Sequence, residues 1–246
     1  MSEGLDTPAS GGAQQALEAF TGKWRQRWPE WTLAEVFLSA PQRPLALAWA
    51  ALQQELCDAA WGGSDARPGE AKLAWWAEEL AGWGRGMRRH PLGAVLQARA
   101  TAWPTLAASL PTLAASRGRP GDPAEAANAL KSFAHAITLV DAELFGSEGP
   151  AGPGTEDIRV ALACLQQARF QQGDDGHVPS SLGRAWDADA RARWAALLLA
   201  DWPPMHGPRP RRLWATLAHL RLERGDGVSP APAWRVVWHA WRAARN

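Results

Sequence analysis

Apolar residues recur at helical spacing through one long stretch of this sequence, residues 42–83, and this stretch limits the chain to a helical fold. Leucine and tryptophan repeat at intervals of three and four residues on both sides of a loop rich in Gly, Asp and Pro: Leu45, Trp49, Leu52, Leu56, Leu73, Trp76 and Leu80. Such spacing places each set on one face of an α-helix. The stretch therefore predicts two long helices that need apolar partners elsewhere in the chain.

The remaining sequence predicts those partners. Alanine and leucine dominate, β-branched residues are few and tyrosine is absent, which favours helix over sheet. Further helices are expected after residue 12 up to Trp28, then at 91–97, 103–116 (interrupted by Pro111), 123–145, 156–171, 187–199, 211–223 and 233–245. We expect a single all-α domain, a bundle of about ten helices over residues 13–246. Residues 1–12 are rich in Gly and Ser and are expected to be disordered.

Composition excludes several classes of function. The net charge of +1 gives no electrostatic reason to expect nucleic-acid binding. Neither Cys57 nor Cys164 has a CxxC partner, so a zinc knuckle or redox pair is not expected, and a reducing compartment is. The N-terminus lacks a basic segment followed by an apolar run, and no long uncharged apolar window occurs. These observations favour a soluble cytoplasmic protein, with most of its sixteen tryptophans in the core.

Three segments carry a family resemblance: the run from Val36 through Arg43 to Leu52, the segment LAWWAEEL at 73–80, and His90-Pro91-Leu92. Their order and spacing resemble the squalene/phytoene synthase superfamily, whose all-helical members include enzymes that join two prenyl diphosphates head to head. The resemblance covers residues 20–96 and implies an isoprenoid-synthase-like fold.

The same resemblance locates the residues that such an enzyme needs. Active members hold diphosphates through Mg²⁺ and two aspartate-rich motifs on facing helices. The first motif should occupy residues 57–61, which read CDAAW, so that only Asp58 remains. The second should precede residues 176–179, and its aspartates fall on Ala168 and Gln172. The chain therefore looks like a divergent member that lacks both motifs.

The resemblance then implies a non-catalytic protein that binds a lipid or a partner protein, or that assists assembly, and that needs no cofactor. Some family members are of this kind, and one assists assembly of respiratory complex I. The run LQQEL at 52–56 looks more like the F-N-x-E-L of that branch than like the aspartate motif. A prenyl or other lipid is expected in a central cavity, with these candidate lining residues: Arg43, Cys57, Trp61, Lys72, Trp76, Cys164, Ala168 and Gln172.

The alternative is an active prenyltransferase of the squalene or phytoene type. The remnant carboxylates Glu55 and Asp58, with Glu78 or Glu79, would have to hold Mg²⁺, and Arg43, Lys72 and Arg169 would hold the diphosphates. The favoured interpretation is that Glu55 and Asp58 lie at a solvated edge or form a salt bridge to Lys72 or an arginine. A third hypothesis is a subunit that pairs with a competent synthase and has a large exposed apolar face.

Two further segments allow two interpretations each. Asp174 and Asp175 precede a glycine, where a turn is favoured over a metal site. The basic segment 209–212 and the final helix, with Trp234, Trp238 and Trp241 in one stripe, suggest either peripheral contact with a membrane or docking on the bundle with the tryptophans inward. Docking is the favoured interpretation.

Overall fold

The computed structural model describes residues 8–146, 153–172, 177–184, 187–225 and 227–245, and side chains from residue 14 onward. Over these ranges the chain forms α-helices and short 3₁₀ helices and no strand, which confirms the all-α prediction. In chain order the elements are α1 (Pro8–Arg27), α2 (Trp31–Ala34), η1 (Glu35–Phe37), α3 (Gln42–Trp61), α4 (Ala66–Trp83), α5 (Gly93–Leu96), η2 (Gln97–Arg99), α6 (Trp103–Ala115), α7 (Pro123–Asn128), α8 (Lys131–Phe145), α9 (Thr155–Gln171), η3 (Ser180–Leu182), α10 (Ala188–Ala200), α11 (Arg209–Leu222) and α12 (Ala233–Arg245).

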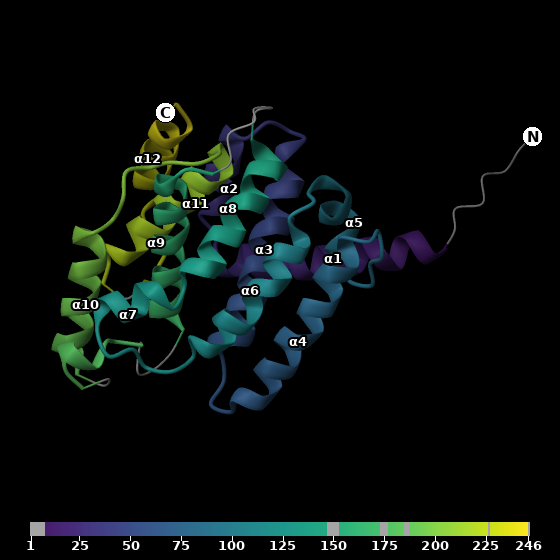
Figure 1. Ribbon diagram of the computed structural model, residues 1–246. Coiled ribbons are helices and arrows are strands. Elements are labelled where there is room, and N and C mark those ends of the chain that lie inside the picture. The colour runs from purple at the N-terminus through teal and green to yellow at the C-terminus, as the bar shows by residue number, and fades with distance from the viewer. Residues whose placement is uncertain (1–7, 147–152, 173–176, 185–186, 226, 246) are drawn as a thin grey trace, which may run out of the picture.

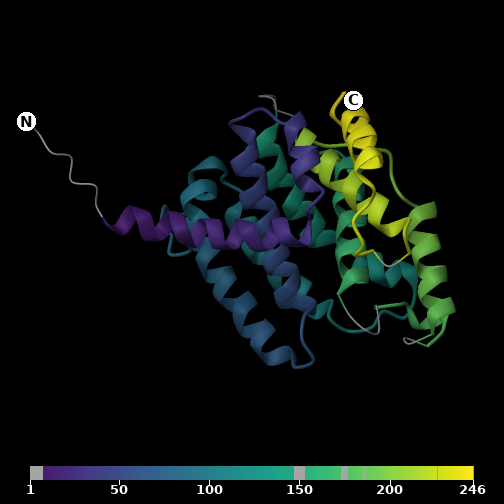
Figure 2. The ribbon, with the colours of Figure 1, turned by 180° about the vertical axis from the view of Figure 1, so that it is seen from behind.

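Helix α3 lies at the centre of the bundle (Figure 1). It packs against α1, α4, α6 and α9, and a continuous series of contacts runs from α4 through α6, α8, α9 and α11 to α12. Most residues of α3 are buried, because alanine at many positions lets neighbouring helices approach from several sides. Helix α1 runs across the back of the bundle (Figure 2).

Tryptophan side chains fill much of the interior. Nine of the described tryptophans are buried: Trp24, Trp28, Trp31, Trp49, Trp61, Trp76, Trp83, Trp103 and Trp194. Many of these rings meet edge to face, as Trp83 and Trp103 do at 5.0 Å between ring centroids, an arrangement that indole rings favour. The expected role of most tryptophans in core packing is confirmed for the described residues.

Three boundaries differ from the sequence-based expectation. Helix α1 begins at Pro8, so residues 8–12, expected to be disordered, are helical; a proline in the first turn costs no hydrogen bond. Residues 1–7 lie outside the described residues. Helix α6 continues through Pro111 instead of being interrupted there.

The helix expected over residues 123–145 is broken into α7 and α8 around Leu130. No Gly or Pro marks this break in the sequence. Helix α7 packs against α9, while α8 packs against both α6 and α9. Tertiary packing therefore divides a segment whose apolar period is continuous.

The last helix was expected to dock on the bundle with its tryptophans inward, and this orientation is wrong. Helix α12 turns Val236, Ala240 and Ala243 inward and leaves its tryptophans exposed. The basic segment 209–212 forms the first turn of α11 and is structural in part, because Arg211 is buried and Arg212 donates to the carbonyl oxygen of Ala243 at 2.8 Å. Among the described residues, no helix combines the length and apolar character needed to span a bilayer.

Candidate functional site

The two places where the resemblance locates metal-binding aspartates face each other at one end of the bundle. Helix α3 carries Cys57, Asp58 and Trp61 in its last turns, and α9 carries Ala168 shortly before it ends beside Gln172. The side-chain amide of Gln172 donates a hydrogen bond to the Asp58 carboxylate across 114 positions of sequence. The fold thus brings together the positions of the first and second motifs.

The Asp58 carboxylate is held by three side chains. Arg27, at the end of α1, lies with its Nη1 3.1 and 3.2 Å from the two carboxylate oxygens. Gln54, one turn earlier on α3, donates to Oδ1 at 2.8 Å, and Gln172 donates to the same oxygen. The guanidinium of Arg27 supplies the positive charge that a metal ion would supply to this carboxylate.

These residues do not fit Mg²⁺. Mg²⁺ takes oxygen ligands in octahedral geometry, usually one or two carboxylates together with water and substrate phosphate. Cys57 offers sulfur, Trp61 offers an indole, and Ala168 offers no donor. Within the described ranges, no three His, Cys, Asp or Glu side chains gather closely enough to hold a metal ion. Asp174 and Asp175 lie outside those ranges.

The second remnant carboxylate, Glu55, pairs with Lys72. The Lys72 Nζ lies 2.5 Å from Glu55 Oε2, which ties α3 to α4. Of the two alternatives in the favoured interpretation, a solvated edge or a salt bridge, the structure shows the salt bridge, from Glu55 to Lys72 and from Asp58 to Arg27. Glu79 also has a structural role, since the backbone N–H groups of Arg89 and His90 donate to it at 2.7 and 2.8 Å.

Two other predicted ligand-binding residues, Arg43 and Trp76, make contacts elsewhere in the fold. Arg43 donates to the carbonyl oxygens of Leu38 and Val36, which fixes the turn before α3. Trp76 is buried and packs against His90, with 4.6 Å between ring centroids. Neither side chain belongs to the group around Asp58.

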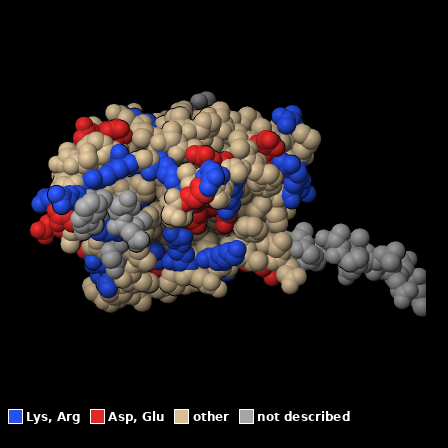
Figure 3. All heavy atoms as spheres, turned by 90° about the horizontal axis from the view of Figure 1, so that it is seen from below, with Lys and Arg blue, Asp and Glu red and all other residues tan. Residues whose placement is uncertain are grey.

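Two arginines donate to carbonyl groups at the ends of α3 and α6. Arg169 donates to the carbonyl oxygens of Ser116 and Gly118, and burial lowers its pKa to about 10. Arg117 donates to the carbonyl oxygens of Ala60 and Gly62 at 3.0 Å each. Carbonyl groups at helix C-termini are unpaired within the helix, and guanidinium groups satisfy them. In the view from below, Lys and Arg side chains lie together with Asp and Glu side chains near the centre of this face (Figure 3).

Trp61 is part of the same structural arrangement. Its Nε1 donates to Ser116 Oγ at 2.9 Å, so the residue at the end of the first motif position is buried against α6. The Trp61 indole has one hydrogen-bond donor, Nε1–H, and Ser116 Oγ accepts from it.

Both cysteines are buried, and the charge of Arg211 acts on both thiols. Burial raises the pKa of the Cys57 thiol, and the neighbouring Asp58 carboxylate raises it further. Burial also raises the pKa of Cys164, to about 11, although Arg211 acts in the opposite direction on both thiols. Both side chains are therefore protonated thiols at neutral pH, and they contribute small apolar surfaces to the interior.

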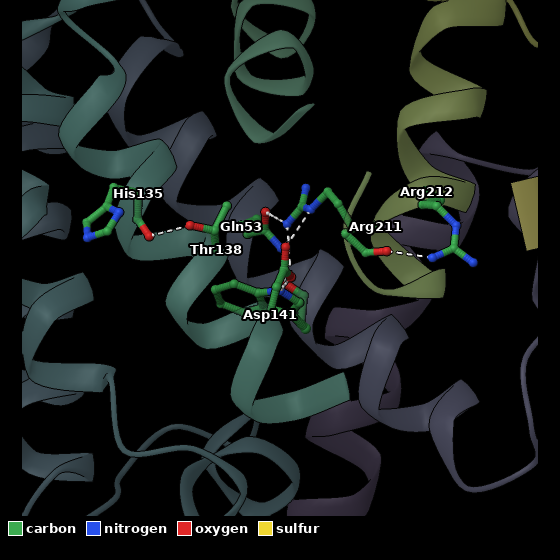
Figure 4. A network of polar contacts seen from close by, with 8 residues as sticks. Gln53, His135, Thr138, Asp141, Arg211 and Arg212 are labelled. Atoms are coloured by element: carbon green, nitrogen blue, oxygen red, sulfur yellow. Dashed lines mark hydrogen bonds and ion pairs between the residues drawn. The ribbon is translucent and has the colours of Figure 1, made fainter. Parts of the chain in front are cut away.

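A buried polar network around Arg211 was not predicted from the sequence (Figure 4). Arg211 Nε lies 2.7 Å from Asp141 Oδ2, and its Nη2 donates to Gln53 Oε1 at 2.8 Å. Trp49 Nε1 donates to Asp141 Oδ1 at 2.7 Å. The only signal in the sequence is an aspartate inside the apolar period of residues 131–145, because a charged residue there needs a buried partner.

An amphipathic pocket of about 260 Å³ lies on the other side of α9, between α7 and α10. Its apolar wall includes Leu162, Trp194, Leu198 and Trp202. Arg159, Gln166 and Asp201 add polar and charged groups. None of the predicted lining residues belongs to it.

Comparison with known proteins identifies the fold. The crystal structure of squalene synthase HpnC from Alicyclobacillus acidocaldarius is similar at a TM-score of 0.54 and 15% sequence identity, over 97% of this chain and 93% of that chain. This chain has a squalene-synthase-like fold. The isoprenoid-synthase-like architecture expected from residues 20–96 is therefore confirmed as a fold, over 97% of the chain. No protein-family model matches the sequence, and no curated protein does.

Proposed function

We propose that this chain is a non-catalytic protein with a squalene-synthase-like fold, which binds a lipid or a partner protein instead of condensing two prenyl diphosphates. One observation carries the proposal. At the facing motif positions, Asp58 is the carboxylate that remains among the described residues, and Arg27, Gln54 and Gln172 hold it. A diphosphate brings several negative charges, which need metal ions or free cationic groups beside them.

The cationic groups that an active enzyme would use have other partners. Lys72 pairs with Glu55, Arg43 donates to the turn before α3, and Arg169 donates to the end of α6. Recruiting them to a diphosphate would require breaking each of these contacts. This arrangement supports the non-catalytic proposal over the alternative of an active squalene- or phytoene-type prenyltransferase.

A product assay tests the proposal directly. Purified protein is incubated with farnesyl and geranylgeranyl diphosphate, Mg²⁺ and NADPH, beside an active synthase in the same buffer, and organic products are identified by mass spectrometry. We expect product from the active synthase alone. Product from this chain that disappears in Asp58→Ala, with unchanged thermal unfolding of that variant, would refute the proposal and assign a reduced metal site to Asp58.

Lipid that co-purifies with the protein tests the proposed binding role. Lipid extracted from the purified chain is compared by mass spectrometry with lipid from Leu198→Trp, a variant whose larger ring would fill the pocket between α7, α9 and α10. A lipid enriched in the unaltered protein and lost in the variant supports lipid binding there. Equal lipid content in both proteins would leave partner binding as the proposed role.

A further inference from the structure

Helix α12 buries its small side chains and exposes its large ones. Its inward face consists of Val236, Ala240 and Ala243. Its outward face carries three tryptophans and a valine, with exposed fractions of 72% for Trp234, 53% for Trp238, 38% for Trp241 and 44% for Val237. A helix stabilised by the bundle alone would place its largest apolar surface inward. The outward face of α12 therefore indicates a partner outside the chain.

The exposed rings form a continuous surface. Trp238 and Trp241 stack at 5.4 Å between ring centroids with an interplanar angle of 28°. Val36, which is 56% exposed, belongs to η1, an element that contacts α12. We call Val36, Trp234, Val237, Trp238 and Trp241 the α12 surface. Apolar patches that are contiguous in this way mark interaction sites more often than single exposed residues do.

The charged side chains that α12 itself carries are positive. The helix contains no acidic residue. Arg242 is exposed, and the Arg245 guanidinium lies 4.7 Å from the centroid of the Trp241 ring, on the same side as the tryptophans. Arg235 is neutralised by Glu223 at 2.6 Å, so Arg242 and Arg245 supply the positive field of this face.

We propose that the α12 surface binds the interface of an anionic lipid bilayer. Indole rings favour the boundary between headgroups and acyl chains, and arginines beside them favour anionic headgroups. A helix of 13 residues is about 20 Å long and lies flat at this depth. This inference does not depend on whether the chain has catalytic activity.

The helix is already ordered for this contact. Its inward face packs against α11 and α2, and Arg212 Nε donates to the carbonyl oxygen of Ala243 at 2.8 Å. Lipid binding therefore needs no coupled folding, and less free energy is lost to ordering the helix than for a free amphipathic peptide.

The test is co-sedimentation with vesicles. The full chain is mixed with phosphatidylcholine vesicles and with vesicles that also contain phosphatidylglycerol. We expect binding to the anionic vesicles, reduced about tenfold or more in the triple variant Trp234→Ala/Trp238→Ala/Trp241→Ala. Replacing Arg242 and Arg245 by glutamine should weaken binding about fivefold per arginine. Trp75→Ala, which removes an exposed tryptophan from α4, is the matched control and should bind unchanged.

Three results would overturn the proposal. They are no sedimentation with anionic vesicles, equal binding to neutral vesicles, and unchanged binding by the triple variant. Self-association that the triple variant abolishes, without vesicle binding, would identify the α12 surface as an interface between copies. If the triple variant unfolds, the test is made on the wild-type protein with vesicles whose lipids carry bromine on their acyl chains. Quenching of the tryptophan fluorescence would support insertion, and absence of quenching would contradict it.

Discussion

At the scale of single residues, two buried arginines of α11 organise the interior. Arg211 pairs with Asp141 and Gln53, and Arg221 pairs with Glu30 at 2.6 Å while its guanidinium stacks over Trp28. A buried ion pair adds little net stability compared with an apolar pair, because both charges must be desolvated. Removing one member alone is costly, because it leaves a buried charge without a partner.

Asp141→Asn should therefore destabilise the protein by about 3–5 kcal/mol, because Arg211 would keep its charge in the interior. The free energy of unfolding is measured by urea titration with circular dichroism. Glu156→Gln is the control, since it removes an exposed i,i+3 pair with Arg159 and should cost less than about 1 kcal/mol. A loss below about 1 kcal/mol for Asp141→Asn would show that Arg211 does not need this partner.

Glu79 gives the stability of the protein a specific dependence on pH. Burial by itself raises the pKa of Glu79, but the N–H groups of His90 and Arg89, the indole of Trp83 and the Arg89 guanidinium lower it, from an ordinary value of 4.5 to about 2. A carboxyl group with a lower pKa in the folded state contributes stability above its unfolded pKa, and this contribution is lost as pH falls toward the folded pKa.

Glu79→Gln should lower the free energy of unfolding by about 2 kcal/mol at pH 7, because hydrogen bonds to a charged acceptor are lost. The difference between the variant and the unaltered protein should shrink between pH 4.5 and pH 2. Urea midpoints measured across this range test the expectation. A difference that stays constant with pH would mean that the Glu79 charge does not stabilise the fold.

At the scale of elements, α3 and α4 approach so closely that one position accepts only glycine. A Cβ atom added at Gly69 would lie 2.1 Å from the carbonyl oxygen of Ala59. Backbone atoms on both sides leave no flexible side chain to move aside. The crossing of the two helices that carry the family resemblance therefore depends on this glycine.

Gly69→Ala should destabilise the protein by about 1–3 kcal/mol through overpacking, although alanine favours helix by about 1 kcal/mol over glycine. Gly22→Ala in α1 is the matched control, because a Cβ there meets nothing within 4 Å, and it should stabilise. Thermal unfolding of both variants tests the pair. A stabilising Gly69→Ala would show that α4 can move away from α3.

Sequence patterns predicted the elements better than their orientation. The period of residues 123–145 predicted helix correctly but could not show the break near Leu130, which arises from packing against different neighbours. The pattern of α12 identified a tryptophan face but could not say whether it points inward, because both orientations have the same period. Small residues point inward where neighbouring helices lie close.

At the scale of the whole molecule, the sequence predicted where the site lies in the fold but did not predict which side chains contact Asp58. The resemblance placed Asp58 and Gln172 at facing positions, and the fold brings them together. The partner that pairs with Asp58, Arg27, comes from a helix with no local link to either motif. Such contacts between distant segments depend on tertiary packing, which one sequence does not specify.

Both thiols are buried in the interior, so we expect them to react slowly with thiol reagents. Cys57 and Cys164 are buried, and each has a raised pKa. A thiol reagent at pH 8 should modify each residue at least about a thousandfold more slowly than in urea, since labelling requires opening of the fold. The single variants Cys57→Ala and Cys164→Ala separate the two rates. Rapid labelling of either thiol would show an open path into the bundle.

The contacts of Asp58 also make the proposed loss of catalysis hard to reverse. A carboxylate returned at residue 172 would replace the amide that donates to Asp58 and set two negative charges against each other, and a carboxylate at residue 57 would replace a buried thiol and carry a desolvation cost. Trp61 would have to shrink and release Ser116. No single reversion restores a metal site, and each lowers stability. Under the proposed function, the metal-binding residues could be lost one substitution at a time. Restoring the metal site would require several substitutions together, at residues 57, 61 and 172.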